Sequence, residues 1–178
     1  FARIDAAIHN ACLCPKVQEA RDSASHREVF DVNYFGALHL TQCVLPHMRR
    51  QGGGRVFFPC AGVGITGFAG LTAYAPSKAA LEALAKCCAL ECADAGVTFH
   101  ILHPPLTRTR SSAFLPVPPA FMADPEIVGR GLAKRLTSRR FVLCHSLLQR
   151  VQTQACYLFP LRMGRLLTRM TARCNPRA

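Results

Sequence analysis

The sequence lacks the signals of several classes of protein. It shows no secretion signal, because no charged start is followed by an apolar run and a cleavage site of small residues. It contains no Cys-x-x-Cys pair, which gives poor support to a zinc site. It also lacks an apolar run with the length and continuity of a membrane-spanning helix. These absences favour a globular cytoplasmic protein with no metal site.

Acidic residues are absent from the last part of the chain. Residues 127–178 contain 11 lysines and arginines and no acidic residue, whereas residues 1–126 contain 11 basic and 10 acidic residues. The two parts therefore carry net charges of +11 and +1. This asymmetry predicts an anionic partner or surface near the C-terminus. Nucleic acid is a disfavoured partner, because Trp is absent, only three Tyr are present and no binding motif occurs.

Ten cysteines are present, which is a high number for a chain of 178 residues. A chain of this size without a secretion signal does not resemble a disulfide scaffold. We therefore interpret the cysteines as free thiols that pack as small hydrophobic groups. A redox role for Cys87, Cys88 and Cys92 is the less favoured alternative.

Apolar residues recur at two different spacings along the chain. Short continuous apolar runs predict buried strands, and recurrence every three or four residues predicts helices. The predicted strands cover 4–11, 56–60, 97–103 and 141–144, and the predicted helices cover 28–50, 74–95 and 124–136, with a loop over 61–72. The alternation of strands and helices predicts an α/β fold with a parallel sheet and helical crossovers.

Tyr74 and Lys78 are the strongest candidates for chemistry. Their spacing of four residues at the start of a predicted helix places both side chains on one face, one turn apart. A lysine ammonium beside a phenol stabilises the phenolate, so we expect Lys78 to lower the pKa of Tyr74. Such a phenol can donate a proton to a carbonyl oxygen or accept one from an alcohol. Taken alone, this spacing also fits a solvated helix face.

Three further motifs surround this pair in a fixed order. Ile8-His-Asn-Ala-Cys12 closes the first predicted strand, and Asn33 lies in a Val-Asn-Tyr-Phe-Gly sequence in the first predicted helix. His103-Pro-Pro-Leu-Thr-Arg-Thr109 follows the third predicted strand. In order and spacing, residues 1–145 resemble the short-chain dehydrogenase/reductase family. In that family a strand ends in Asn-Asn-Ala-Gly, Tyr-x-x-x-Lys opens a later helix, and a later strand ends in Pro-Gly-x-x-x-Thr.

This resemblance implies a Rossmann-like, doubly wound parallel sheet and a catalytic site. Tyr74 is then the general acid/base, Lys78 binds the nicotinamide ribose and tunes Tyr74, and Asn33 anchors a water in the proton relay. The implied chemistry is hydride transfer between a nicotinamide and a carbonyl carbon.

The resemblance also implies a cofactor, NADP or NAD, with NADPH favoured. Asn10 and Ala11 are expected along the adenosine side of the cofactor, and Thr109 at its carboxamide. The complete set of implied cofactor-binding residues is Asn10, Ala11, Tyr74, Lys78, Pro104 and Thr109.

Several positions depart from the motifs of the family, among them His9, which replaces the first asparagine of Asn-Asn-Ala-Gly. Ala61 stands thirteen residues before Tyr74, where the family carries a catalytic serine or threonine. Removing a donor of this kind costs on the order of a hundredfold in rate. Cys12 replaces the glycine of Asn-Asn-Ala-Gly. Pro105 replaces the glycine of Pro-Gly, and the paired prolines resemble the 3-ketodihydrosphingosine reductase branch.

The glycine-rich turn that binds the pyrophosphate in this family is missing. No Gly-x-x-x-Gly-x-Gly sequence occurs in the chain. The resemblance therefore predicts a partial Rossmann-type domain over residues 1–145, without its first βαβαβ half. We expect the sequence to be a fragment of a longer protein and to bind a dinucleotide weakly by itself.

Residues 146–178 are predicted to form a basic tail with helices on both sides of Pro160. Met163, Leu166 and Met170 recur at helical spacing, and arginines occupy a neighbouring face. A basic amphipathic helix of this kind suits an anionic membrane surface. Packing of the apolar stripe on the domain is an equally favoured alternative.

Three functions remain open at this stage. The first is an NAD(P)-dependent reductase or dehydrogenase of a small-molecule or lipid carbonyl, cytoplasmic or peripheral on a membrane (the endoplasmic reticulum in a eukaryote). The second is a non-catalytic relative that serves as a binding module, which Ala61 and the missing phosphate loop favour. The third is a basic adaptor that binds membranes. The resemblance also implies a homo-oligomer that associates through helices 28–50 and 74–95.

Overall fold

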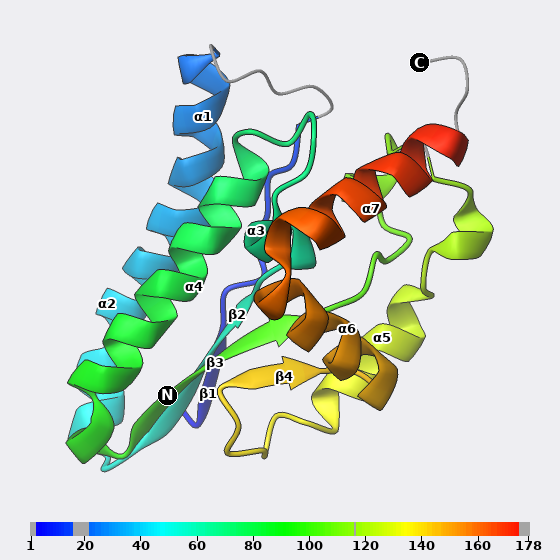
Figure 1. Cartoon of the computed structure of the whole chain (residues 1–178). Coiled ribbons are helices and arrows are strands. Elements are labelled where there is room, and N and C mark those ends of the chain that lie inside the picture. Colours follow the sequence, from blue (N-terminus) through cyan, green and yellow to red (C-terminus); the bar gives the residue numbers. More distant parts are fainter. Residues whose placement is uncertain (1–2, 16–21, 116, 175–178) are drawn as a thin grey trace.

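The fold is a parallel sheet with helices on both sides (Figure 1). The computed structural model describes residues 3–15, 22–115 and 117–174, with side chains up to residue 171. The strands are β1 (Ala6–Ile8), β2 (Gly54–Pro59), β3 (Val97–His103) and β4 (Val142–Cys144). The α-helices are α1 (Ser23–Phe30), α2 (Gly36–Arg50), α3 (Gly62–Thr66), α4 (Tyr74–Glu91), α5 (Pro125–Ala133), α6 (Leu147–Leu158) and α7 (Pro160–Cys174). A π-helical turn, η1 (Asp31–Phe35), joins α1 to α2.

The strands of the described residues run parallel in the order β1-β2-β3-β4. Ala7 pairs with Val56, and Leu102 pairs with Leu143. Almost every position of β3 is buried. This burial explains its nearly continuous apolar sequence, since helical crossovers cover both faces of a parallel sheet. The predicted fold class, α/β with a Rossmann-like parallel sheet, is confirmed.

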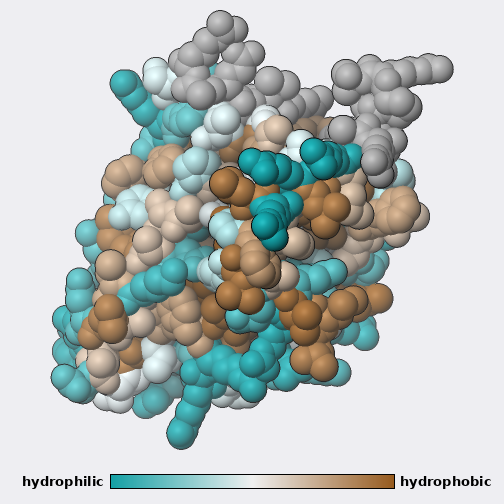
Figure 2. Space-filling model, in the orientation of Figure 1, coloured by the Kyte–Doolittle hydropathy of each residue, from teal (hydrophilic) through white to brown (hydrophobic). Residues whose placement is uncertain are grey.

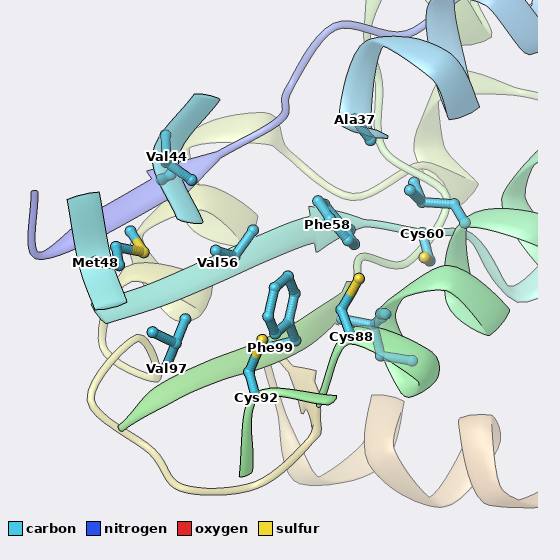
Figure 3. Close-up of a cluster of buried hydrophobic side chains, with 14 residues drawn as sticks. Ala37, Val44, Met48, Val56, Phe58, Cys60, Cys88, Cys92, Val97 and Phe99 are labelled. Atoms are coloured by element: carbon cyan, nitrogen blue, oxygen red, sulfur yellow. The ribbon is translucent and has the colours of Figure 1, made fainter. Parts of the chain in front are cut away.

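Alternate side chains of the central strands build two cores on opposite faces of the sheet. Val56 and Phe58 pack with residues of α2 and α4 in one core (Figure 3). Phe57 packs with Leu102 and Leu143 in the other core, beside α5. Because both faces are packed, the C-terminal ends of the strands are held together at one edge of the sheet.

Cysteine side chains help to fill these cores. No cysteine among the residues with described side chains forms a disulfide, and the buried ones are Cys60, Cys88, Cys92, Cys144 and Cys156. Burial raises the pKa of the Cys88 thiol to about 11, which keeps this thiol protonated and unreactive. The interpretation of the cysteines as small hydrophobic groups therefore holds for these five, while Cys12, Cys43 and Cys87 are exposed.

Several predicted boundaries differ from the structure. The strand predicted over 4–11 covers only Ala6–Ile8, and the helix predicted over 124–136 covers Pro125–Ala133. The first long helical segment begins at Ser23 rather than at residue 28, because the Asp22 side chain caps it by accepting a hydrogen bond from the Ser25 N–H. The predicted loop over 61–72 contains the short helix α3. Helix α4 ends at Glu91 rather than at residue 95, and a 3-10 turn follows it. For the first helical segment a local cap, which apolar spacing does not report, decides the boundary.

The basic tail forms two helices that meet at Pro160, as predicted. Helix α6 contacts β4, and α7 crosses over α3 (Figure 1). The crossing requires glycine, because a Cβ on Gly164 would lie 2.7 Å from the backbone oxygen of Thr66. One face of α7 therefore packs on the domain, while the arginines on its other side are exposed.

A buried polar cluster joins α6 to α4 and β3. Glu82 of α4 accepts a hydrogen bond of 2.7 Å from the Tyr157 hydroxyl of α6 and lies 2.8 Å from Lys86 Nζ. At the end of β3, His103 Nε2 lies 3.6 Å from the other carboxylate oxygen of Glu82. Burial alone would raise the pKa of Glu82, but these three contacts lower it to about 2. Glu82 is therefore ionised at neutral pH and fixes the first helix of the tail to the domain.

We expect Gly164→Ala to loosen the contact between α7 and α3. The new Cβ would overlap the backbone oxygen of Thr66, and overpacking of this kind costs about 1–3 kcal/mol. Gly129 of α5 is the matched control, because a Cβ there meets no atom within 4 Å and alanine is the better helix former by about 1 kcal/mol. Urea unfolding should show a less stable Gly164→Ala protein and a slightly more stable Gly129→Ala protein. Equal effects of the two substitutions on stability would contradict the close approach of α7 to α3.

We expect Glu82→Gln to lower the free energy of unfolding at neutral pH by about 1–3 kcal/mol, because it removes the charge that Lys86 and Tyr157 contact. The folded pKa of Glu82 lies below its ordinary value of 4.5. Its contribution is therefore present above that value and is lost as the pH falls toward 2. Urea unfolding at neutral pH and near the folded pKa should show that the difference between the two proteins narrows in acid.

The matched control for this experiment is Glu126→Gln, which removes a carboxylate from an exposed ion pair with Arg130. Exposed pairs contribute little, so we expect a change below about 1 kcal/mol at either pH. A difference between the unchanged protein and Glu82→Gln that stays constant from neutral pH to acid would contradict the role of the Glu82 charge.

Candidate active site

Loops at the C-terminal edge of the sheet hold the candidate site. Because β1, β2 and β3 are parallel, their C-terminal ends lie at one edge, where open α/β sheets bind their ligands. Residues 9–12 follow β1, Cys60 and Ala61 follow β2, and Pro104 and Pro105 follow β3. The residues predicted to bind a nicotinamide cofactor are drawn largely from this edge.

Lys78 fixes the start of α4 to the end of β2. Its side chain is buried, and its Nζ donates a hydrogen bond of 2.9 Å to the backbone oxygen of Pro59. The same Nζ lies 5.7 Å from the centre of the Tyr74 ring. A buried ammonium is costly unless it has partners, and here the carbonyl and the aromatic ring provide them. The structure thus brings Tyr74 and Lys78 together, as their spacing predicts.

The environment of Tyr74 favours a neutral phenol. Burial raises the pKa of Tyr74, and the nearby thiols of Cys12 and Cys14 raise it further. Cys12 Sγ lies 4.0 Å from the Tyr74 hydroxyl oxygen. The pKa of Tyr74 is therefore raised, where the sequence predicts that Lys78 lowers it, and burial is the main cause of the difference. A neutral phenol carries the proton that the reduction of a carbonyl requires.

Asn33 ties the loop after β1 to the first turn of α4. It is fully buried in the π-helical turn η1, a type of distortion often found at functional sites. Its Oδ1 accepts a hydrogen bond of 2.8 Å from the Leu13 N–H, and its Nδ2 donates to the Leu13 backbone oxygen at 3.0 Å and to Ser77 Oγ at 2.9 Å. Ser77 Oγ in turn donates to the backbone oxygen of Tyr74 at 2.8 Å. Asn33 therefore positions the tyrosine, and its predicted hold on a relay water stays a prediction.

The polar groups closest in sequence to Ala61 are engaged elsewhere. Ala61 itself is half-buried and extended between β2 and α3. Burial raises the pKa of the adjacent Cys60 thiol to about 12, so this thiol is a weak donor. The Thr66 hydroxyl donates to two backbone oxygens of its own turn, and the Thr72 hydroxyl lies 3.4 Å from His26 Nε2. None of these groups takes the place of the serine or threonine hydroxyl that the family carries.

The remaining predicted cofactor residues lie on two loops. Asn10 and Ala11 are exposed directly after β1, and Pro104 is half-buried directly after β3. These three share the sheet edge with the tyrosine and the lysine. Thr109 lies farther along the loop, where it caps a 3-10 turn and its N–H donates to Ser112 Oγ at 2.9 Å. The predicted contact of Thr109 with a carboxamide stays a prediction.

The residues at this edge fit the nicotinamide-ribose half of a dinucleotide. The Lys78 ammonium has three N–H groups, and the hydrogen bond to Pro59 uses one of them. Exposed backbone after β1 lies at the same edge of the sheet. No glycine-rich turn in this chain offers a cradle for a pyrophosphate. The fit therefore concerns one half of the cofactor.

Two contacts of the site are not predicted from the sequence. Ser77 is buried and links the asparagine side chain to the tyrosine backbone, and its only signal is its position next to Lys78. His9 lies against Gly36, where a Cβ would come within 2.7 Å of the imidazole Nε2. Burial lowers the pKa of His9, and the charge of Lys78 lowers it further. The imidazole therefore tends to stay neutral beside the lysine.

A cavity of about 340 Å³ opens between the loops that follow β1 and β3. Its size is in the range of small-molecule sites. The two loops are about a hundred residues apart in the sequence and share no motif, so this cavity could not be predicted. Its lining residues are Cys14, Pro15, Arg110, Ser111, Ala113 and Phe114. One of these lining residues, Cys14, also raises the pKa of Tyr74.

Two features are absent from the described part of the chain. Within it, no three His, Cys, Asp or Glu side chains gather in a way that could hold a metal ion. In the same residues, no helix combines the length and the apolar character needed to cross a membrane. The candidate site consists of the loops at the C-terminal edge of the sheet and the first turn of α4.

Comparison with known proteins shows to which family the chain belongs. The family model of short chain dehydrogenase matches residues 1–116. The uncharacterized oxidoreductase YusZ of Bacillus subtilis is 33% identical over 97 residues, which are 52% of this chain and 35% of that protein. The 3-ketodihydrosphingosine reductase of Dictyostelium discoideum is 34% identical over 91 residues, which are 50% of this chain and 27% of that protein. The chain thus spans about a third of the length of these two relatives.

The same fold occurs in solved structures. A short chain dehydrogenase from Burkholderia cenocepacia, in complex with NADP, aligns with a TM-score of 0.79 and 20% sequence identity, over 92% of this chain and 68% of that one. At this identity the likeness shows the fold alone, so the family assignment rests on the family model, whose match includes Asn33, Tyr74 and Lys78. With the parallel sheet and the match over residues 1–116, the chain belongs to the short-chain dehydrogenase family.

Proposed function

We propose that the protein carrying this chain transfers hydride between a nicotinamide cofactor, NADP or NAD, and the carbonyl carbon of a small molecule. The observation that carries the proposal is the buried Lys78 ammonium, 5.7 Å from the ring of Tyr74 at the C-terminal edge of the sheet. Family membership supports the same type of reaction. The resemblance favours NADPH as the form of the cofactor.

In the direction of reduction, Tyr74 is the proton donor. A bound reduced nicotinamide would supply the hydride for the carbonyl carbon. The Tyr74 hydroxyl donates its proton to the carbonyl oxygen. The phenolate that remains lies near Lys78, whose positive charge stabilises it until a proton from solvent restores the phenol. Asn33 acts through Ser77, which holds the backbone oxygen of Tyr74 and so fixes the start of α4.

A long-chain or lipid carbonyl is the proposed substrate class. Support comes from the 34% identity to a 3-ketodihydrosphingosine reductase over half of this chain. The paired Pro104 and Pro105 resemble that branch of the family as well. The cavity between the loops that follow β1 and β3 also offers apolar walls at Pro15, Ala113 and Phe114 to an alkyl chain.

A non-catalytic binding module is the second candidate function. It is favoured by Ala61, because the donor that would hold the substrate oxygen is missing and the neighbouring thiol and threonines do not supply one. In this case the sheet edge would bind a ligand without turnover. Measurements of binding and turnover on the same protein separate the two candidates.

A homo-oligomer that associates through α2 and α4 is also part of the proposal. On α4, Leu90 is 79% exposed, and Phe35 at the junction with α2 is 43% exposed. Burial of such side chains in a second copy would remove apolar surface from water. Sedimentation equilibrium of the protein would give the mass of the assembly.

We expect Tyr74→Phe to abolish turnover while cofactor binding persists. Loss of a general acid lowers the rate by about 10²–10⁴-fold. The assay follows NADPH consumption with a panel of long-chain ketones, on the protein that carries this chain. Tyr34→Phe is the matched control, because Tyr34 packs on Phe30 and Phe35 away from the proposed chemistry. Full activity of Tyr74→Phe would refute the assignment of the proton donor.

We expect Ala61→Ser to raise turnover on the order of a hundredfold, because it restores a hydroxyl where the family carries its substrate donor. Ala61→Cys serves as a control of similar size with a much weaker donor. The same NADPH assay measures both variants, and fluorescence titration measures cofactor binding. Turnover that stays undetectable in Ala61→Ser, with the cofactor still bound, would favour the non-catalytic module.

A further inference from the structure

The outer face of α6 is apolar and exposed. Figure 2 looks onto α6 and α7 from outside and shows hydrophobic side chains over α6, with hydrophilic and hydrophobic side chains side by side over α7. Four large apolar side chains of α6 are 60–72% exposed, namely Leu147, Leu148, Val151 and Leu158. The opposite face of the helix holds the buried Thr153 and Cys156. The exposed stripe is therefore distinct from the face of α6 that packs on the domain.

The outer face of α7 combines positive charge with apolar side chains. At 100° per residue, Arg162 and Arg169 lie at the middle of the exposed face, opposite Gly164, which packs on α3. Arg165 lies next to them and is also exposed. The exposed apolar residues on the flanks of these arginines are Leu161 at 68%, Leu166 at 49% and Met170 at 55%.

The arginines of α7 have no carboxylate partner among the described side chains. No ion pair includes Arg162, Arg165 or Arg169, and residues 127–178 contain no acidic residue that could supply one. Arg162 instead lies over the ring of Phe159, at 5.9 Å from its centre, and Phe159 is 51% exposed at the junction of the two helices. The positive charge is therefore available to an external anion.

We propose that this surface of α6 and α7, the α6–α7 face, docks on an anionic phospholipid membrane. Leucine and valine side chains would enter the boundary of the acyl chains, and the arginines would reach the lipid phosphates along the same plane. A membrane offers both layers at once, apolar and negative, which is the combination that the α6–α7 face presents. The proposal does not depend on the hydride-transfer proposal, because no residue of the candidate active site takes part in it.

Charge makes a second copy of the chain an unfavourable occupant of this face. A symmetric dimer through α6 and α7 would place two pairs of helices against each other, each pair with five arginines and no acidic residue. Like charges across an interface oppose association, and no acidic residue of α6 or α7 can alternate with them. An acidic protein partner is an alternative outcome of the test below.

The test is sedimentation of the full chain with vesicles. Vesicles of phosphatidylcholine are compared with vesicles that contain about 30% phosphatidylserine, at low and at high salt, since screening weakens attraction to an anionic surface. We expect binding to the anionic vesicles, much weaker binding to the neutral ones, and release at high salt. Absence of binding to the anionic vesicles would overturn the proposal and favour an acidic protein partner.

Two groups of substitutions locate the binding surface. The triple change Arg162→Gln, Arg165→Gln and Arg169→Gln should weaken binding to anionic vesicles on the order of a hundredfold, at roughly a factor of five for each charge near the surface. The control changes Lys134→Gln, Arg135→Gln and Arg139→Gln remove the same total charge from exposed positions outside α6 and α7 and should weaken binding only a few-fold. Equal losses in both triple variants would show a non-specific effect of net charge and overturn the proposal.

The apolar part of the α6–α7 face needs its own variant. Leu147→Ser with Val151→Ser should also weaken binding to anionic vesicles at low salt, because it removes apolar side chains that would enter the boundary of the acyl chains and leaves the arginines unchanged. Because both side chains are exposed, we expect the circular dichroism spectrum and the unfolding midpoint to stay unchanged. Retention of full vesicle affinity by this double variant would contradict insertion of α6.

Discussion

A hydrogen bond from the buried Lys78 ammonium to the Pro59 carbonyl joins the first turn of α4 to the last residue of β2. The position of Tyr74 depends on this bond, because the tyrosine lies one turn before the lysine on the same helix. The lysine can be buried there because a carbonyl oxygen and an aromatic ring face its charge. The parallel sheet supplies the geometry, since it brings the end of β2 next to the ends of β1 and β3.

The second constraint is the attachment of the tail. Tyr157 donates to the buried Glu82 of α4, and Gly164 allows α7 to approach α3. These contacts use one face of each tail helix. The other faces, with exposed leucines on α6 and arginines on α7, remain free of the domain. The same attachment connects the tail to the helix that carries Tyr74 and Lys78, so a surface contact at α6 lies next to the element that positions the site.

The sequence allows the sheet, the order of its elements and the pairing of Tyr74 with Lys78 to be predicted, because each leaves a periodic or a spaced signal. Two other features leave no such signal in the sequence. The direction of the Tyr74 pKa depends on how deeply the phenol is buried and on the thiols of Cys12 and Cys14, which only the packed structure brings near it. The hydrogen bonds of the Asn33 side chain with Leu13 and Ser77 depend on a π-helical turn. The spacing of apolar residues does not reveal such a turn.

The sequence shows that Ala61 lacks a hydroxyl, but it does not show whether a neighbouring group replaces that hydroxyl. A motif gives the identity of a residue at a position, but its chemistry depends on the neighbours. The neighbours of Ala61 in the chain provide no free hydroxyl, so the consequence of its missing donor follows from the structure. The raised pKa of Cys60 has the same origin, because burial and not sequence determines the state of that thiol.

The most direct test of the central claim is transfer of deuterium from cofactor to product. The protein that carries this chain is incubated with NADPH deuterated at the transferable position and with a long-chain ketone, and the alcohol is analysed by mass spectrometry. Our account predicts an alcohol that gains one deuterium at the carbonyl carbon, and predicts that Lys78→Met loses this product. An alcohol without deuterium, or no alcohol at all while the cofactor is bound, would contradict the account.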